Sequence, residues 1–294
     1  MSGSIAPFTP QDAAAVAALL DAVPELPSST EESFRSFAAL SFNRGARDFR
    51  VVRDGDHLCA LLTSTLLTDT SPPLRHFRIV VHPEHRRRGI ASRLLAEVAA
   101  QEGASEVRAQ CNSQDTWAAG NAFLEGAGFH VAYTELLMSV ASPSPSAATS
   151  APEGVVLRPA RPSDDHAWIQ LHHEAYSHMH DFHPLTAADL VTERAAPGFA
   201  MTVAEAMGEV LGYCHVLDLD ATEGLINSVV VAKAFRRQGL GQVLLHAGVQ
   251  GLFAGGVGVV SLNVAADNTG AARLYERYGF ETYDKLLTYQ RTPC

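Results

Sequence analysis

Residues 80–95 read Val-Val-His-Pro-Glu-His-Arg-Arg-Arg-Gly-Ile-Ala-Ser-Arg-Leu-Leu, and residues 230–245 read Val-Val-Ala-Lys-Ala-Phe-Arg-Arg-Gln-Gly-Leu-Gly-Gln-Val-Leu-Leu. Seven of the sixteen aligned positions are identical, without a gap. Each copy has an apolar β-branched run, a basic turn with glycine and a helix-forming run, which predicts a strand, a turn and a helix. Because free N–H groups and arginines at a helix N-terminus bind anions, the sequence predicts a repeated anion-binding turn.

The similarity between the two halves extends beyond this turn. Residues 123–129 (Phe-Leu-Glu-Gly-Ala-Gly-Phe) correspond to residues 274–280 (Leu-Tyr-Glu-Arg-Tyr-Gly-Phe). In each half we expect one or two helices, a hairpin near Gly55 or Gly208, and a long strand that leads into the basic turn. A helix, a strand, a short helix and a last strand follow. Helices and strands in this order predict a duplicated α/β fold of the mixed, α+β kind.

A linker divides the chain almost in half. Residues 141–152 contain only Ala, Ser, Pro and Thr, and small residues with spaced prolines cannot build a core. We therefore predict an N-terminal domain over 1–140, a linker over 141–153 and a C-terminal domain over 154–294. A length of 294 residues suits two domains of ordinary size.

Composition excludes several classes of protein. With 47% hydrophobic and 18% charged residues, the chain has enough apolar residues to form hydrophobic cores. Its net charge of −10 shows that it lacks the excess of basic residues that is typical of a nucleic-acid-binding surface. The cysteines Cys59, Cys111, Cys214 and Cys294 are scattered, which argues against a zinc site or a disulfide framework. No apolar run reaches the length of a membrane span and no signal peptide is evident, so we expect a cytoplasmic monomer or homodimer that binds no membrane.

The strand, the R-x-x-G-x-G/A turn and the following helix resemble the acetyl-CoA-binding turn of the GCN5-related N-acetyltransferase (GNAT) superfamily. The resemblance covers nearly the whole chain, and its tandem form is loosely similar to the mycothiol synthase group. It implies two tandem GNAT-like acyl-CoA N-acyltransferase domains, each a mixed, splayed β-sheet flanked by helices. It also implies acetyl-CoA (coenzyme A) as the co-substrate. Small residues in the turn would let the backbone approach the pyrophosphate of this molecule.

The same resemblance implies the residues that contact coenzyme A. Strand N–H groups before the second turn would polarise the thioester carbonyl. In the second half the expected contacts are Val229, Val230, Val231, Arg236, Arg237, Gln238, Gly239, Leu240, Gly241 and Asn268. In the first half they are Arg86, Arg87, Arg88, Gly89, Ile90 and Ala91.

The two halves differ in the segment before the last strand. Residues 263–280 resemble the superfamily's N-x(3–4)-N-x-x-A-x-x-L-Y-x-x-x-G-F segment, which implies that Asn268 bonds the pantetheine or nearby backbone. Tyr275 would then protonate the departing thiolate as a general acid, or else be a core aromatic residue. Trp117 and Leu124 stand at these positions in the first half, and leucine transfers no proton. That half is a binding-only or structural lobe, an active domain with another acid or none, or an acetyl-CoA sensor.

The general base is less evident. The superfamily often has a Glu on the strand before the turn, whereas residues 225–231 contain no carboxylate. Glu223 is our candidate, acting through water, and Asp218, Asp220 and His215 are alternatives. Acidic residues near a hairpin are also common as solvated turn formers.

A run of histidines lies within residues 171–184. In this superfamily the first helices and their connecting loop cover the acceptor pocket, so we expect Tyr176, His180 and His183 to contact the acceptor. Ordinary surface histidines and a metal site are the alternatives, and the spacing matches no familiar zinc motif. Our prediction contains no metal.

The resulting hypothesis is an acetyl-CoA-dependent N-acetyltransferase that acts on a primary amine of a small molecule or peptide. The amine attacks the thioester directly, and the C-terminal domain does the work. The alternative is a pair of acyl-CoA-binding or structural domains without transfer activity.

Overall fold

The structure, a computed structural model, describes residues 3–26, 29–39, 41–68, 72–102, 107–143, 150–178, 182, 184–195, 198–219 and 222–291. The chain forms two compact units. Unit 1 comprises Met1–Tyr133 with Leu286–Cys294, and unit 2 comprises Thr134–Lys285.

Unit 1 takes its elements from the first half of the chain, and its last strand from the end of the second. They are β1 (Ser4–Pro7), η1 (Pro10–Asp12), α1 (Ala13–Asp21), α2 (Glu31–Ala39), η2 (Ser41–Ala46), β2 (Arg50–Asp54), β3 (His57–Leu67), β4 (Leu74–Val81), η3 (Pro83–His85), α3 (Ile90–Glu102), β5 (Arg108–Gln114), α4 (Ala118–Gly126) and part of β12 (Glu281–Arg291). The strand order in this sheet is β1-β2-β3-β4-β5-β12.

Unit 2 repeats the same succession. Its elements are part of β6 (His130–Val140), β7 (Val156–Pro159), η5 (Pro162–Asp164), α5 (Asp165–Tyr176), α6 (Ala187–Ala195), β8 (Phe199–Ala206), β9 (Glu209–Asp218), β10 (Glu223–Val231), η6 (Lys233–Phe235), α7 (Leu240–Gly255), β11 (Val259–Ala265) and α8 (Thr269–Tyr278). The strand order is β6-β11-β10-β9-β8-β7. The predicted hairpins are confirmed, since the turns at Gly55 and Gly208 join β2 to β3 and β8 to β9.

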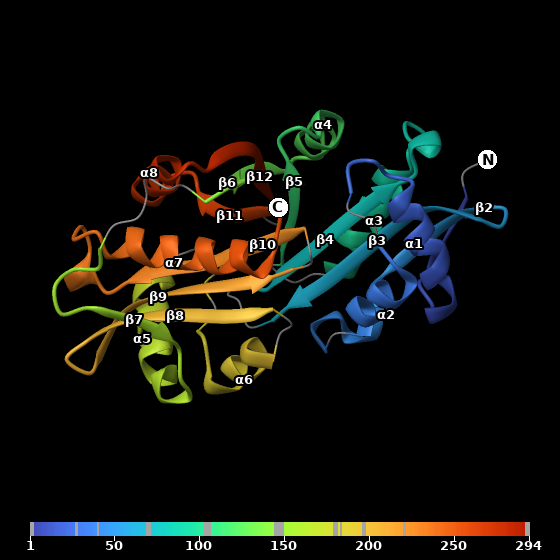
Figure 1. The fold of residues 1–294 in the computed structure, drawn as a ribbon. Coiled ribbons are helices and arrows are strands. Elements are labelled where there is room, and N and C mark those ends of the chain that lie inside the picture. Colours follow the sequence, from blue (N-terminus) through green and yellow to red (C-terminus); the bar gives the residue numbers. More distant parts are fainter. Residues whose placement is uncertain are drawn as a thin grey trace. The chain divides into compact units, whose positions relative to one another are not determined.

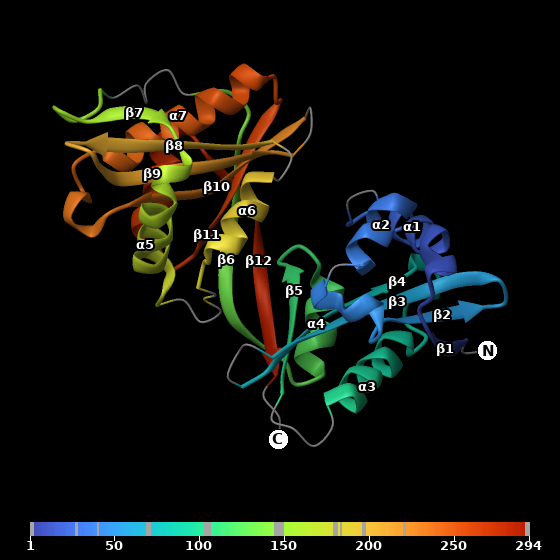
Figure 2. The same cartoon turned by 90° about the horizontal axis from the view of Figure 1, so that it is seen from below.

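Helices cover both faces of each sheet. In unit 2, α7 packs against β8, β9 and β10, and α5 and α6 lie on the other side (Figure 1). In unit 1, α3 lies on one side of β3 and β4, and α1 and α2 lie on the other (Figure 2). Each face has its own apolar core, so the mixed sheet flanked by helices that we predicted is confirmed.

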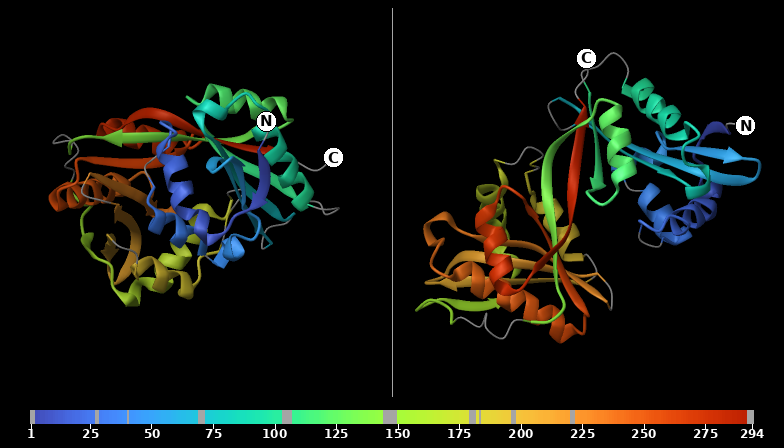
Figure 3. Two further views of the ribbon diagram at one scale, coloured as in Figure 1. Left: turned by 90° about the vertical axis from the view of Figure 1, so that its right-hand side faces the viewer. Right: turned by 90° about the horizontal axis from the view of Figure 1, so that it is seen from above.

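The final strands of the two halves are exchanged. Residues 135–140 of β6 pair antiparallel with β11, although β6 follows β5 in the chain. Residues 286–291 of β12 pair with β5, and this C-terminal red segment can be followed in Figure 3. The compact units therefore follow strand pairing and do not divide at the linker. Most of the predicted linker lies outside the described residues, and the division at 141–153 stays a prediction about the sequence repeat.

Both sheets are splayed at their centre. β10 pairs with β11 in parallel only over residues 223–225, and β4 pairs with β5 only over residues 74–76. Both β10 and β4 then continue alone on that side to Val231 and Val81. Each sheet therefore has an open edge that ends at a basic turn.

Candidate active site

The basic turn of unit 2 forms an open backbone cradle at the N-terminus of α7. Arg237 and Gly239 adopt the left-handed conformation, with φ of 65° and 85°, and both are exposed. Such alternating conformations turn successive N–H groups toward one side, and the first N–H groups of α7 have no intrahelical acceptor. A Cβ added at Gly239 would meet no atom within 4 Å. The space over this helix N-terminus is therefore open, and the binding of a phosphate group of coenzyme A there stays a prediction.

The first arginine of the motif braces the turn. Arg236 Nε donates to the Val231 carbonyl at 2.9 Å, and its guanidinium lies 3.7 Å from Glu174. The Lys233 N–H also donates to Glu174 at 2.7 Å. Arg236 is thus engaged within the protein, and the Gln238 amide donates to the Ala234 carbonyl at 3.2 Å, which leaves the backbone N–H groups and the exposed Arg237 to meet an anion.

The strand before the turn presents two of the three predicted backbone donors. The Ala232 N–H donates to the Leu211 carbonyl at 2.8 Å, and hydrogen-bonded pairs alternate along an antiparallel ladder. Val230 therefore faces β9, whereas Val229 and Val231 direct their N–H and C=O groups toward the open edge. Val230 contributes a buried side chain instead.

A β-bulge lies at the start of this open edge. Ile226 pairs with Val216 and Ser228 pairs with His215, so Asn227 is an extra residue in β10. Bulges bend a strand and re-aim its side chains. Here the Asn227 amide donates to His215 Nδ1 at 3.0 Å.

His215 is almost wholly buried, with 2% exposure. Because Nδ1 accepts from Asn227, Nε2 carries the proton, and it has no hydrogen-bond partner among the described residues. The Glu193 carboxylate on α6 lies 3.8 Å from Nε2. Burial lowers the pKa of His215 to about 4. Burial also raises the pKa of Glu193, and the nearby negative charge of Asp189 raises it further.

Three tyrosines lie close together in unit 2. Tyr275 on α8 is buried and shares an apolar cluster with Val229. Burial raises the pKa of Tyr275 and Tyr213, and proximity to Tyr176 raises both further. Burial also raises the pKa of Tyr176 to about 12. The Tyr275 phenol therefore stays protonated at neutral pH.

Asn268 caps the helix that carries Tyr275. Its side-chain oxygen accepts from the Ala271 N–H at 3.2 Å, which satisfies one of the first donors of α8. A contact with the pantetheine stays a prediction.

Glu223 lies at the closed end of β10. Its carboxylate accepts from the Ser261 hydroxyl at 2.5 Å, and it pairs across the sheet with Val259. It is about 20 Å along the strand from Val229 at ~3.3 Å per residue. The structure does not bring this predicted base to the open edge.

The predicted acceptor contacts are covered in part. Tyr176 lies at the end of α5 beside Tyr213 and Tyr275, whereas His180 and His183 lie outside the described residues, as does Asp220. Within the described part of the chain, no group of three or more His, Cys, Asp or Glu residues is placed to hold a metal ion.

Comparison with known proteins agrees with this geometry. The profile of the Acetyltransferase (GNAT) family matches residues 165–280, and that of the Acetyltransferase (GNAT) domain matches residues 46–131. A mycothiol acetyltransferase from Thermobispora bispora is 32% identical, over 96% of this chain and 97% of the relative. One from Streptomyces avermitilis is 30% identical, over 98% and 94%.

This chain belongs to the GNAT family of acetyltransferases. It is an N-acetyltransferase with the tandem architecture that we predicted.

Solved structures share this tandem fold. A GCN5-related N-acetyltransferase from Sphaerobacter thermophilus superimposes with a TM-score of 0.80 at 22% identity, over 98% of this chain and 95% of that one. A tandem GNAT protein from the clavulanic acid biosynthesis pathway gives a TM-score of 0.74 at 19% identity, over 99% of both chains.

Of the helices in the described part of our chain, none combines the length and apolar character that crossing a bilayer requires.

Sequence reasoning missed three polar residues of this GNAT domain. Asn227, Glu193 and Tyr213 surround His215 or lie beside it on the face under α5 and α6. An Asn inside an apolar strand run hints at an irregular position, and that was the available signal for the bulge. Glu193 has no such signal, because only tertiary packing brings α6 to His215.

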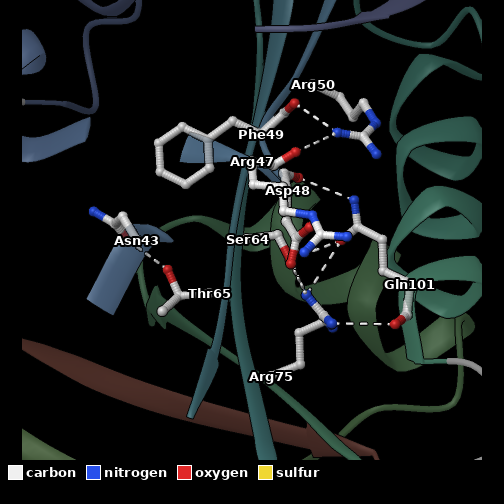
Figure 4. A network of polar contacts seen from close by, with 9 residues as sticks. All are labelled: Asn43, Arg47, Asp48, Phe49, Arg50, Ser64, Thr65, Arg75 and Gln101. Carbon is white, nitrogen blue, oxygen red and sulfur yellow. Dashed lines mark hydrogen bonds and ion pairs between the residues drawn. The ribbon is translucent and has the colours of Figure 1, made fainter. Parts of the chain in front are cut away.

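The GNAT domain of unit 1 has different side chains at the positions of Tyr275 and Leu225. Leu124, at the position of Tyr275, is buried in the core. Arg75, at the position of Leu225, is locked in a polar network, in which NH1 lies 3.1 Å from Asp48 and 3.0 Å from Ser64 (Figure 4). Its NH2 donates to the Gln101 carbonyl at 3.1 Å. These contacts join β4 to β3, to α3 and to the segment before β2 within the fold of unit 1.

Proposed function

We propose that this chain transfers an acetyl group from acetyl-CoA to a primary amine of a small molecule or peptide, and that unit 2 is the active one. The observation that carries the proposal is the buried, protonated Tyr275 in the same cluster as Val229, at the open edge of β10. Unit 1 has the same turn and the same opening, with Leu124 at the tyrosine position. A sensor would not need a phenol at this position in one unit alone.

Acetyl-CoA supplies an activated thioester. The cradle at Arg237 and Gly239 binds its pyrophosphate, and the Val229 N–H donates to the thioester carbonyl as the amine attacks it directly. Tyr275 then donates its proton to the departing thiolate. Binding both substrates at one open edge supplies much of the rate.

The acceptor amine must lose a proton, and Glu193 with His215 is the pair that we assign to it. Glu193 is half-exposed, so it can receive a proton and pass it to solvent, and its raised pKa makes it a stronger base than an ordinary carboxylate. Glu223 remains a candidate only through a chain of water, because of its place at the closed end of β10.

Relatives named mycothiol acetyltransferase make a mycothiol-type acceptor the first to test. Release of free thiol from acetyl-CoA, measured over a panel of amino acids, polyamines, aminoglycosides, cysteinyl glycosides and peptide N-termini, would identify the acceptor. Isothermal titration with acetyl-CoA accompanies it. Binding without release for any amine would favour the sensor, and no binding would favour a structural pair.

A further inference from the structure

The last strand of the first half of the chain completes the sheet of unit 2. Residues 135–140 of β6 pair antiparallel with β11 (Figure 1). Because side chains alternate along a strand, Leu136, Met138 and Val140 lie on one face of it. All three belong to the apolar cluster that contains Tyr275. The first half therefore supplies part of the core in which the Tyr275 side chain is buried.

β6 also contacts the segment that carries Tyr275 near both ends of α8. Just ahead of the helix, the Ala266 N–H donates to the Thr134 carbonyl at 2.9 Å. Directly after it, Gly279 adopts the left-handed conformation with φ of 115°, and a Cβ built there would lie 4.0 Å from Val140 Cγ2. The position of α8 over the sheet is thus set in part by this strand.

Met138 lies on β6 between these two contacts. Its side chain is fully buried, with 0% exposure, and it pairs across the sheet with Leu262. Loss of a buried side chain leaves a void, because a close-packed core relaxes only partly around it. A void in this cluster gives α8 room to shift, and the Tyr275 phenol shifts with it relative to the open edge of β10.

The exchanged strand of unit 1 holds the corresponding helix with polar groups. Tyr289 of β12 stands at the position of Met138 in the repeat, and its phenol donates to Glu125 on α4 at 3.2 Å. Arg291, two residues on, donates to the Ala127 carbonyl just after that helix at 3.3 Å. In both units, a strand from the other half of the sequence therefore fastens the helix at the acid position.

We propose that β6 of the first half positions the acid of unit 2, with Met138 as the positioning residue. This inference rests on the role proposed for Tyr275. The predicted C-terminal domain over 154–294 contains the turn, Asn268 and Tyr275, yet it lacks this strand. The reacting unit is therefore composite, and its acid depends on a strand from the half that has leucine at the acid position.

Thiol release by variants of the full chain tests this, with acetyl-CoA and the fastest amine of the panel above, a cysteinyl glycoside first. Met138→Ala should lower kcat by about three- to thirtyfold, because even a small displacement of a reacting group is costly. Acetyl-CoA affinity, measured by isothermal titration, should stay within about twofold, since the turn is untouched. Met138→Leu, which nearly conserves volume, should restore kcat to within about twofold of wild type.

The matched control is Leu287→Ala. It removes a buried side chain from the exchanged strand of unit 1, where no acid follows, so kcat should stay within about twofold of wild type. An equal loss of kcat in Leu287→Ala and Met138→Ala would mean that both act through general stability, and would overturn the proposal.

The Tyr275→Phe background separates positioning of the phenol from damage to the fold. If Met138 acts through the phenol, Met138→Ala should lower kcat by no more than about twofold once the phenol is gone, because residues that act as a unit are not additive. A full additional loss in that background overturns the proposal. If Met138→Ala does not fold, Val140→Ala decides by the same comparison.

The outcome also separates this inference from the proposed function. Wild-type turnover of Tyr275→Phe alone would remove the acid from the proposed function, and the positioning role with it. Strong loss in Tyr275→Phe together with additive loss from Met138→Ala would keep the acid and refute the positioning role only.

Discussion

The two units carry different chemistry at the same place in the same fold. Under the first helices of unit 1, the sheet presents Thr63 and Arg78, whereas unit 2 presents His215 and Ser228. The β3–β4 register runs without a break, whereas the bulge at Asn227 interrupts β9–β10. The duplicated scaffold therefore has the same basic turn in both copies, and the two copies differ in the residues of the ladder beneath the first helices.

The turns differ far less than the ladders. Arg86 Nε donates to the Val81 carbonyl at 3.2 Å and its guanidinium pairs with Glu25 at 2.9 Å, as Arg236 does with Val231 and Glu174. Conservation of this brace in both units shows that the turn can be maintained where no acid follows it. Possession of the turn alone is thus a poor indicator of which unit reacts.

The largest effect should come from a side chain placed in one cradle. Gly239→Glu should abolish turnover, because glutamate strains a left-handed position, enters the open space above the helix and repels the anion. Gly89→Glu, at the equivalent φ of 75°, should leave most activity. Thiol release is the measurement, and matching unfolding curves are the control. If Gly89→Glu is the folded but inactive variant, the working unit has been assigned backwards.

Loss of the proposed acid should have the next largest effect. Tyr275→Phe should lower turnover by about 10- to 1,000-fold, below the upper range of general acids because water replaces part of the function. Acetyl-CoA affinity should barely change. Tyr278→Phe is the matched control, since it removes a buried phenol three residues away on the same helix. Equal turnover of wild type and Tyr275→Phe between pH 6 and 9 would remove Tyr275 from the mechanism.

A smaller effect should come from the acceptor side. Glu193→Gln should lower kcat/KM by about ten- to a hundredfold, because the amine then lacks its base. Glu193 works only when ionised, so wild-type activity should fall as the pH drops through its raised pKa, above the usual range of a glutamate. The variant should lose that acidic limb. Glu209→Gln, an exposed hairpin acid, should keep it. An unchanged limb in Glu193→Gln would point to another base.

Local patterns predicted the elements well. The basic turns, the hairpins at Gly55 and Gly208 and the splayed sheets all follow from short sequence signals or from the family resemblance. The exchange of β6 and β12 did not, because a strand pattern fixes which face is buried but does not name the partner strand. The partners of residues 135–140 are more than a hundred positions away.

The residues of the candidate site likewise fall into those that belong to short motifs and those that only tertiary packing brings together. Gly239 and Tyr275 belong to contiguous motifs and could be proposed as site residues from the sequence, whereas Glu193 meets His215 only through packing of α6 on the sheet. Glu223 was predicted because it stands just before the strand that leads into the turn. As the first residue of β10 it lies at the closed end, where β10 still pairs with β11.

The smallest effect on activity should come from the polar network of unit 1. Arg75→Met removes a buried cation and leaves the Asp48 carboxylate without its ion-pair partner, which should lower the free energy of unfolding by roughly 2–4 kcal/mol. Turnover should stay within about twofold, because Arg75 serves only the fold of the unit that we assign no chemistry. Arg35→Met, which breaks an exposed ion pair with Glu31, should cost at most ~0.5 kcal/mol. Urea unfolding measures both. A folded Arg75→Met variant with strongly reduced turnover would show that unit 1 contributes to the reaction.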